Sequence, residues 1–238
     1  MKILIVDTET TGKWLFQKHP MHASQPDLVQ IGAQLFEFVR HPMGECEHRL
    51  TDNDPVDEMI KPSSFHSGQP WTMDPGAQET HGLSKEKCET EGVPLIEALR
   101  AFYALSRDAD LIIAYNADFD RNVLHRALWR VHGRLPTPPR RVDDKMIPGV
   151  SLPYRHDLRW WCPMKALTPV VKAEHDPPRS PKLPPRRRYK CPTLAESYAH
   201  VTEGQTFDGA HDAMVDVRAT ATVVKWCFEQ GLVPGSKT

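Results

Sequence analysis

Two carboxylates follow an apolar run near the start of the chain. Residues 3–6 read Ile-Leu-Ile-Val, which is typical of a buried strand, and Asp7 and Glu9 come directly after them. Side chains alternate between the two faces of a strand, so these two carboxylates point the same way. Adjacent carboxylates repel each other unless they are protonated or bridged by cations, and divalent ions that prefer oxygen ligands are the simplest bridge. Alone, the pair favours a solvated strand end followed by a turn; further carboxylates would make it a metal site.

A second segment supplies another acid at the start of a helix. Residues 111–115 form a short apolar run, which predicts a buried strand, and a helix is expected over residues 119–131. Asp120 lies in the first turn of that helix. Because the helix dipole also favours acids at this position, one of the two nearby acids needs no other role, and we assign that structural role to Asp118.

A third segment places an aspartate inside the last predicted helix, over residues 212–230. Asp216 stands among small apolar residues, although aspartate is a poor helix-interior residue, and metal ligation would explain its presence. Arg218 is two residues away and does not face it. His211 precedes the helix and, taken alone, is typical of a surface histidine at a helix start.

Together the three segments resemble the exonuclease motifs of the DnaQ-like 3′-to-5′ exonucleases, in the branch with four acids and a histidine. Asp7 and Glu9 match the first motif, Asp120 in Asn-Ala-Asp-Phe-Asp the second, and His211 with Asp216 the third. Each motif is short, but their order and spacing agree with the family as a set.

The resemblance covers most of residues 1–132 and 192–230 and implies an α/β fold of the ribonuclease H-like type. Such a fold has a mixed sheet, with three antiparallel strands followed by parallel ones, flanked by helices. The 238 residues are enough for one domain, residues 1–238, of the exonuclease type. The stretch 135–192, rich in proline and arginine, is predicted to be an insertion or long connection with little regular structure.

The remaining elements follow from periodicity and turn residues. We expect a second strand over residues 27–38, a third between Cys46 and Ile60, and an irregular segment over residues 73–83. Helices are expected over residues 94–106, after Ser84 and around residues 193–200.

The residues suit hydrolysis of a phosphodiester. Two divalent ions, Mg²⁺ or Mn²⁺, about 4 Å apart can stabilise the attacking and the leaving oxygen. We expect Asp7 to contact both ions, Glu9 and Asp216 to complete one, and Asp120 to support the other. His211 needs no metal role, and its imidazole is expected to accept the proton of the attacking water.

The resemblance also implies a pocket for the terminal nucleotide. Its residues would lie beside the acids and make contacts that any base can accept. They are Thr8, Thr10, Gly12, His81, Leu83, Asn116 and Phe119. Burial in the core is the alternative for Leu83 and Phe119.

These features predict a metal-dependent 3′-to-5′ exonuclease that releases nucleoside 5′-monophosphates from single-stranded or frayed DNA, as in repair or proofreading. An exoribonuclease with the same site is one alternative, because nothing indicates how a 2′-hydroxyl is treated. A nucleic-acid-binding or polymerase-accessory module is the alternative of another class. Replicative members of the family carry a polymerase-binding tail, whereas this chain ends eight residues after Gln230, so we expect no tight polymerase complex.

The composition implies that nucleic acid could bind only through local basic patches. The chain has 30 Lys and Arg against 31 Asp and Glu, so it has no overall basic field. The basic run 177–190 could contact phosphates or be a solvated linker. Five cysteines without a Cys-x-x-Cys pair, no signal peptide and no membrane span are expected of a cytoplasmic protein. Oligomeric state is not indicated.

Overall fold

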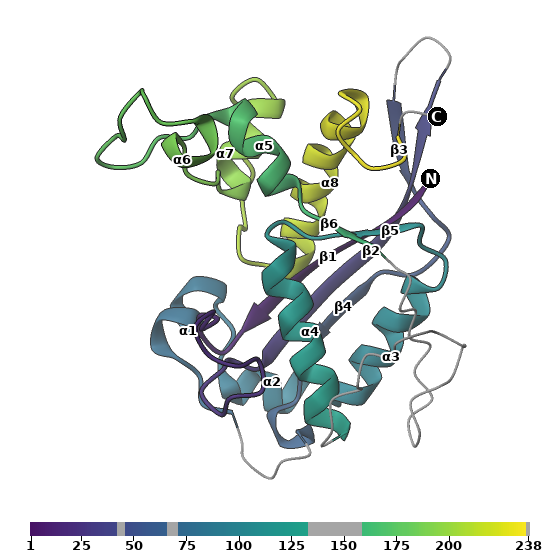
Figure 1. Cartoon of the computed structure of the whole chain (residues 1–238). Coiled ribbons are helices and arrows are strands. Elements are labelled where there is room, and N and C mark those ends of the chain that lie inside the picture. The colour runs from purple at the N-terminus through teal and green to yellow at the C-terminus, as the bar shows by residue number, and fades with distance from the viewer. Residues whose placement is uncertain (42–45, 66–70, 133–158, 237–238) are drawn as a thin grey trace.

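The computed structural model describes residues 1–41, 46–65, 71–132 and 159–236 (Figure 1). Within these residues a six-stranded sheet has the order β3-β2-β1-β5-β6, with β4 paired to β2. β2 runs antiparallel to β1, β3 and β4, whereas β5 is parallel to β1 and β6. The predicted mixed α/β sheet is therefore confirmed. The strands are β1 (Lys2–Thr10), β2 (Leu28–Arg40), β3 (Cys46–Leu50), β4 (Val56–Met59), β5 (Leu111–Ile113) and β6 (Trp160–Trp161).

The predicted third strand is two strands. β3 pairs with residues 36–40 of β2, and β4 pairs with residues 30–33, so both lie on the same edge of β2. Between them the sequence Asp-Asn-Asp-Pro at 52–55 favours a turn, and proline has no N–H for a ladder. Prediction of one strand was wrong because these turn residues interrupt the pairing.

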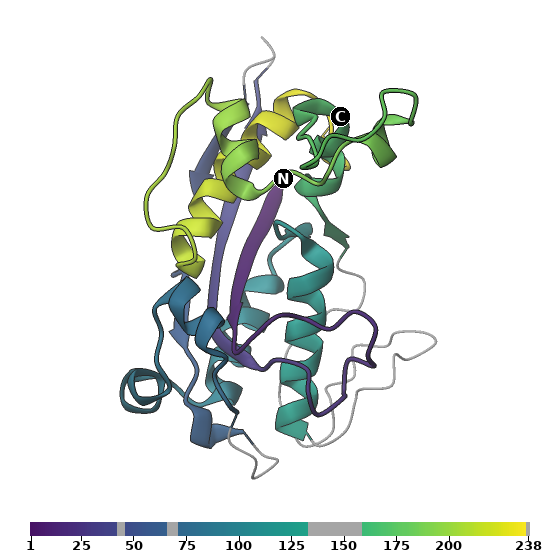
Figure 2. The ribbon, with the colours of Figure 1, turned by 90° about the vertical axis from the view of Figure 1, so that its left-hand side faces the viewer.

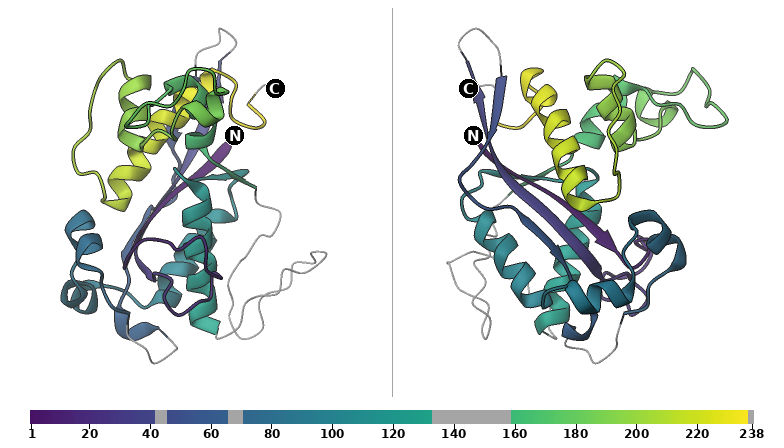
Figure 3. Two further views of the ribbon diagram at one scale, coloured as in Figure 1. Left: turned by 60° about the vertical axis from the view of Figure 1, so that its left-hand side comes forward. Right: turned by 180° about the vertical axis from the view of Figure 1, so that it is seen from behind.

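Helices cover both faces of the sheet. α3 and α4 lie on one side of the strands, and α5, α7 and α8 lie on the other (Figures 1 and 3). Alternation along β1 matches this division, since Leu4 and Val6 belong to the core with α3 and α4, and Ile3 and Ile5 to the core with α8. The helices are α1 (Pro75–His81), α2 (Lys85–Glu91), α3 (Leu95–Ser106), α4 (Ala117–His132), α5 (Pro163–Val171), α6 (Pro185–Arg188), α7 (Leu194–Val201) and α8 (Ala213–Glu229), with a 3₁₀ turn, η1 (Pro62–Ser64).

The segment 73–83, predicted to be irregular, contains α1. The Asp74 carboxylate accepts hydrogen bonds from the N–H groups of Gly76 and Ala77 at 3.0 and 3.1 Å, and Pro75 occupies the first helical position. Gly82 ends the helix in the left-handed conformation, with φ 72°. These capping signals override the proline and glycine that favoured a loop.

Part of the long connection is also ordered into regular elements. Residues 133–158 lie outside the described residues, but β6 and α5 follow directly, so the prediction of little regular structure is wrong for residues 160–171. Leu167 of α5 is fully buried in the core that includes α8. The basic run contains α6, and the Arg188 guanidinium lies 5.0 Å from the centre of the Tyr189 ring.

Among the helices that the structure describes, none combines the length and the apolar content needed to cross a bilayer.

Gly32 lets α8 lie against the sheet at the position that matters for the acids. It sits in β2 directly opposite Asp7 of β1. A Cβ atom added there would lie 2.7 Å from the backbone carbonyl carbon of Ala213, the first residue of α8. The side-chain oxygen of Gln30 accepts a hydrogen bond from the Ala213 N–H at 3.4 Å. The start of α8, and with it Asp216, is therefore held close to the end of β1.

We expect Gly32→Ala to destabilise the protein by about 1–3 kcal/mol, because the added methyl group forces α8 away from β2. Thermal unfolding measures this effect. Gly12→Ala is the matched control, since its Cβ would lie 3.5 Å from that of Asp74, an ordinary contact. Equal unfolding temperatures for the two variants would contradict the proposed close approach.

Candidate active site

The end of β1 extends past its parallel neighbour. β1 pairs with β5 only through residues 3–5, so on the side opposite β2 the following residues have no paired strand, and Thr8 contacts the start of α4 there. Asp7 and Glu9 continue the face of Ile3 and Ile5, toward α8, whereas Thr8 points to the opposite face. Figure 2 looks onto this side of the molecule, where the end of β1, α1 and the starts of α4 and α8 come together.

Asp120 is the buried acid of α4. Only 1% of it is exposed, and the Thr8 hydroxyl donates a hydrogen bond to its Oδ1 at 2.8 Å. Its Oδ2 is buried without a hydrogen-bond partner among the described residues. Asp118, to which the sequence analysis gave a structural role at the helix start, lies in the first turn of α4, one residue after its start, and its carboxylate accepts hydrogen bonds from Arg121 and Lys165.

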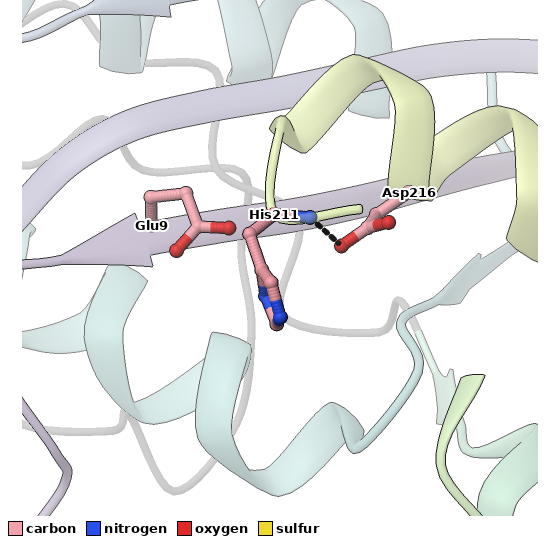
Figure 4. Close-up of side chains that lie close together, drawn as sticks. All are labelled: Glu9, His211 and Asp216. Carbon is pink, nitrogen blue, oxygen red and sulfur yellow. Dashed lines mark hydrogen bonds between the residues drawn. The ribbon is translucent and has the colours of Figure 1, made fainter. Parts of the chain in front are cut away.

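Asp216 and His211 come from the start of α8 (Figure 4). The Asp216 Oδ2 accepts a hydrogen bond from the His211 backbone N–H at 3.2 Å, and its Oδ1 is buried without a partner in the described part of the chain. His211 is exposed and has a left-handed backbone, with φ 71°. One oxygen each from Glu9 and Asp216 and one ring nitrogen of His211 lie within 4.8 Å of one another. This group includes the histidine, which the sequence had not placed among the ligands.

Asp7 and Glu9 lie close enough to Asp120 and Asp216 to feel their charges. Burial, followed by the charges of Asp120, Glu9 and Asp216, holds the pKa of Asp7 well above its usual range. Burial and the charges of Asp216 and Asp120 raise the pKa of Glu9 to about 8. Burial also raises the pKa of Asp120 to about 7, although the Thr8 hydrogen bond opposes this, and it raises the pKa of Asp216.

These observations fit a site for divalent cations. Buried polar atoms are almost always satisfied, yet Asp120 and Asp216 each keep one carboxylate oxygen without a partner in the described structure. Cations would satisfy those oxygens and would favour the ionised carboxylates, which burial, together with the repulsion on Asp7 and Glu9, disfavours. A donor set of carboxylate oxygens, with one imidazole beside them, suits Mg²⁺ or Mn²⁺.

His81 joins the end of β1 through hydrogen bonds. Its Nδ1 accepts from the Leu83 N–H at 3.1 Å, so Nε2 carries the proton and donates to the Thr10 carbonyl at 3.3 Å. Burial lowers the pKa of His81, and nearby His211 lowers it further. The Thr10 hydroxyl donates to the Gly12 carbonyl at 2.7 Å. Of the predicted substrate contacts, Thr8 and Thr10 thus lie in the last residues of β1, and Gly12 and His81 contact Thr10.

The other predicted substrate contacts lie farther into the fold or at the helix start. Leu83 is 8% exposed and belongs to the core, against which the half-buried Phe119 packs. Asn116 precedes α4 with φ 73°, and its carbonyl accepts a hydrogen bond from the Phe119 N–H at 2.8 Å. Contact of these three residues with a nucleotide stays a prediction.

Sequence reasoning missed two residues that organise the start of α8. Asp212 caps the helix by accepting from the N–H groups of Met214 and Val215, both at 3.0 Å, and its charge contributes to the raised pKa of Asp7. Gln30 is 6% exposed and donates to Asp57 at 3.0 Å while accepting from Ala213. The available signal for Gln30 was a polar residue directly between Val29 and Ile31 in a predicted strand.

Solved structures of exonuclease I are similar in fold. The zinc-bound complex of E. coli exonuclease I with single-stranded DNA has a TM-score of 0.58 over 96% of this chain, at 18% identity. The E. coli enzyme with a dT13 oligonucleotide gives 0.56 over 95%, at 19% identity, and apo exonuclease I gives 0.55 over 95%, at 18%. This chain spans 40–41% of the length of those proteins. No protein-family model and no curated protein matches the sequence. At this level of identity the likeness shows the fold: the mixed α/β sheet and its flanking helices are arranged in this chain as in the matching part of exonuclease I.

The raised pKa of Glu9 predicts how metal removal changes stability. Glu9 ionises near pH 4.5 in an unfolded chain and near pH 8 in the folded one, so the folded protein binds more protons between these values. In EDTA, ionisation of Glu9 should therefore leave the unfolding temperature unaffected below pH 4.5. It should lower the unfolding temperature progressively as the pH rises from 4.5 to 8. Added Mg²⁺ or Mn²⁺ should reverse the fall.

Glu9→Gln should raise the unfolding temperature in EDTA at pH 8 by roughly 3 °C, the shift that about 1 kcal/mol produces in a chain of this size. Glu47→Gln, at an exposed position of β3, is the control. A Glu9→Gln variant with the stability and pH dependence of the wild type would show that the pKa of Glu9 is not raised in the folded protein.

Proposed function

We propose that this chain is a metal-dependent 3′-to-5′ exonuclease that releases nucleoside 5′-monophosphates from single-stranded or frayed DNA. The observation that carries the proposal is the convergence of Asp7, Glu9, Asp120 and Asp216, whose pKa values burial raises, beside His211. The similar fold of exonuclease I, solved with single-stranded DNA, supports the choice of DNA.

The four acids would hold two Mg²⁺ or Mn²⁺ ions. When bound, such ions supply positive charge that stabilises the attacking and leaving oxygens of the phosphodiester. The protein's part is to fix the acids: Thr8 holds Asp120 by a hydrogen bond, and the His211 N–H holds Asp216. Pre-positioned groups of this kind lose little entropy when the substrate binds.

His211 would act as the base. An exposed imidazole can accept the proton of the attacking water and return it to solvent. The left-handed backbone at His211 and the hydrogen bond of its N–H to Asp216 fix the direction in which its side chain points. The ring is therefore placed at the edge of the acidic cluster.

A binding module without catalysis is disfavoured by the charge of the cluster. Carboxylates repel phosphates, so a protein that only bound nucleic acid would gain nothing from gathering four of them. An exoribonuclease would need the same acids, and a matched RNA substrate distinguishes the two enzymes.

The proposed activity predicts shortening of a 5′-labelled single-stranded DNA oligonucleotide from its 3′ end in Mg²⁺, with nucleoside 5′-monophosphates as products. Asp7→Asn should lower the rate by about 10³-fold or more, because an acid shared by both ions is lost. Gel electrophoresis and chromatography measure these outcomes. Asp54→Asn, in an exposed loop, should match the wild type. Cleavage by the Asp7→Asn variant at the wild-type rate would contradict the proposal.

His211→Ala tests the base separately from the metal site. We expect kcat to fall by about 10²–10⁴-fold, while Mg²⁺ still raises the unfolding temperature as in the wild type. Loss of the Mg²⁺-dependent rise as well would make His211 a ligand instead of a base. A kcat equal to that of the wild type would remove it from the mechanism.

A further inference from the structure

A second pocket lies beside the candidate active site, between the first turn of α4 and the start of α5. Its volume is about 510 Å³, within the range of pockets that hold small ligands. The residues that matter among its lining are Asp118, Arg121, Trp160, Trp161 and Lys165. None of them belongs to the acidic cluster, and the proposed hydrolysis uses none of them.

Strand order places this pocket next to the acids. β1, β5 and β6 run parallel, so their carboxyl ends lie at one edge of the sheet. Asp7 follows the paired part of β1, α4 follows β5, and α5 follows β6. Figures 1 and 2 show β6 reaching the sheet edge beside the start of α4. Only Phe119 separates Asp118, in the pocket, from Asp120, in the cluster. A strand of nucleic acid leaving the cluster along this edge would meet the pocket.

The pocket has an excess of positive charge. Lys165 Nζ and Arg121 Nη2 both bond to the Asp118 carboxylate, the arginine at 3.0 Å, so two cations share one anion. The Lys165, Arg121 and Asp118 side chains are 58%, 43% and 40% exposed. Ion pairs this exposed add little to stability, so a phosphate can replace the carboxylate as the partner of the cations at small cost.

Two tryptophans stand beside these cations. Trp160 and Trp161 form the edge strand β6, and both are half-buried: Trp160 packs against the core with α4, and Trp161 against the core with α8. Both also line the pocket. Aromatic rings next to Lys and Arg are the combination that holds single-stranded nucleic acid, through base stacking and phosphate contacts.

We propose that this pocket binds a nucleotide on the 5′ side of the scissile bond, with Lys165 and Arg121 on its phosphate and a tryptophan ring on its base. This inference rests on the proposed function. In the absence of substrate, Asp118 occupies the place of the phosphate and neutralises part of the charge. Binding then requires the phosphate to displace Asp118 from the two cations.

Kinetics with two substrates test the pocket. A single-stranded oligothymidylate can reach it, whereas the p-nitrophenyl ester of thymidine 5′-monophosphate has no 5′-side nucleotide. For Lys165→Ala we expect the ratio of the two KM values, oligonucleotide over ester, to rise about fivefold. The slope of log KM against log salt for the oligonucleotide should fall by about 0.7, the value for one phosphate contact on a single strand. Arg49→Ala is the matched control, since Arg49 of β3 forms a similarly exposed ion pair with Glu37 of β2.

Asp118→Asn separates binding from a merely structural pair. It breaks both ion pairs, as Lys165→Ala breaks one, yet it frees the cations for phosphate. The KM ratio should therefore fall below that of the wild type, in the opposite direction to Lys165→Ala. If the pairs only fastened α5 to α4, both variants would lower the unfolding temperature and leave the KM ratio unchanged, which would overturn the inference.

The two proposals fail in different ways. Wild-type protein that hydrolyses neither substrate in Mg²⁺ or Mn²⁺ would overturn the proposed function, and this inference with it. Wild-type protein that hydrolyses both, with a KM ratio unaffected by Lys165→Ala, would overturn only the 5′-side pocket.

Discussion

Repulsion among buried carboxylates is the constraint on which the rest of this structure depends. Asp7 and Glu9 cannot separate, because β1 is paired with β2 along its whole length and its apolar residues are fixed in cores on both faces of the sheet. The free energy of that packing holds acids together whose pKa values burial raises. The fold thus maintains a cluster that is unfavourable without cations and favourable with them, as a cation site should be.

The other two acids, Asp120 and Asp216, lie in the first turns of α4 and α8, and contacts close to those turns fix their positions. Gly32 has no side chain where Ala213 approaches β2, and the Asp212 carboxylate caps the same helix. On the opposite face, Thr8 ties Asp120 of α4 to β1. Each contact involves the first turn or the cap of a helix. Positions at element ends combine a rigid base with access to solvent, which a site for a polymeric substrate requires.

The sheet edge explains how a chain of nearly neutral charge can accommodate nucleic acid. Its 30 basic and 31 acidic side chains create no general attraction for phosphates. The strand order instead brings α4, α5 and the end of β1 to one edge, so anionic and cationic groups lie next to each other there. Acids gather where metal ions would be needed, and Arg121 of α4 and Lys165 of α5 stand at the same edge, where they would meet phosphate.

The sequence by itself determined the class of fold, and it singled out the four acids and the histidine from which the function is proposed, because apolar runs, helical periodicity and motif order are local signals. The capping residues Asp74 and Gly82 were local signals too, and they outweighed the proline and glycine that suggested a loop. Only the tertiary structure decided the partners: Thr8 for Asp120, 112 residues away, Lys165 for Asp118, 47 residues away, and Ala213 for Gly32. Such contacts depend on how elements pack in three dimensions, which no periodicity within one segment encodes.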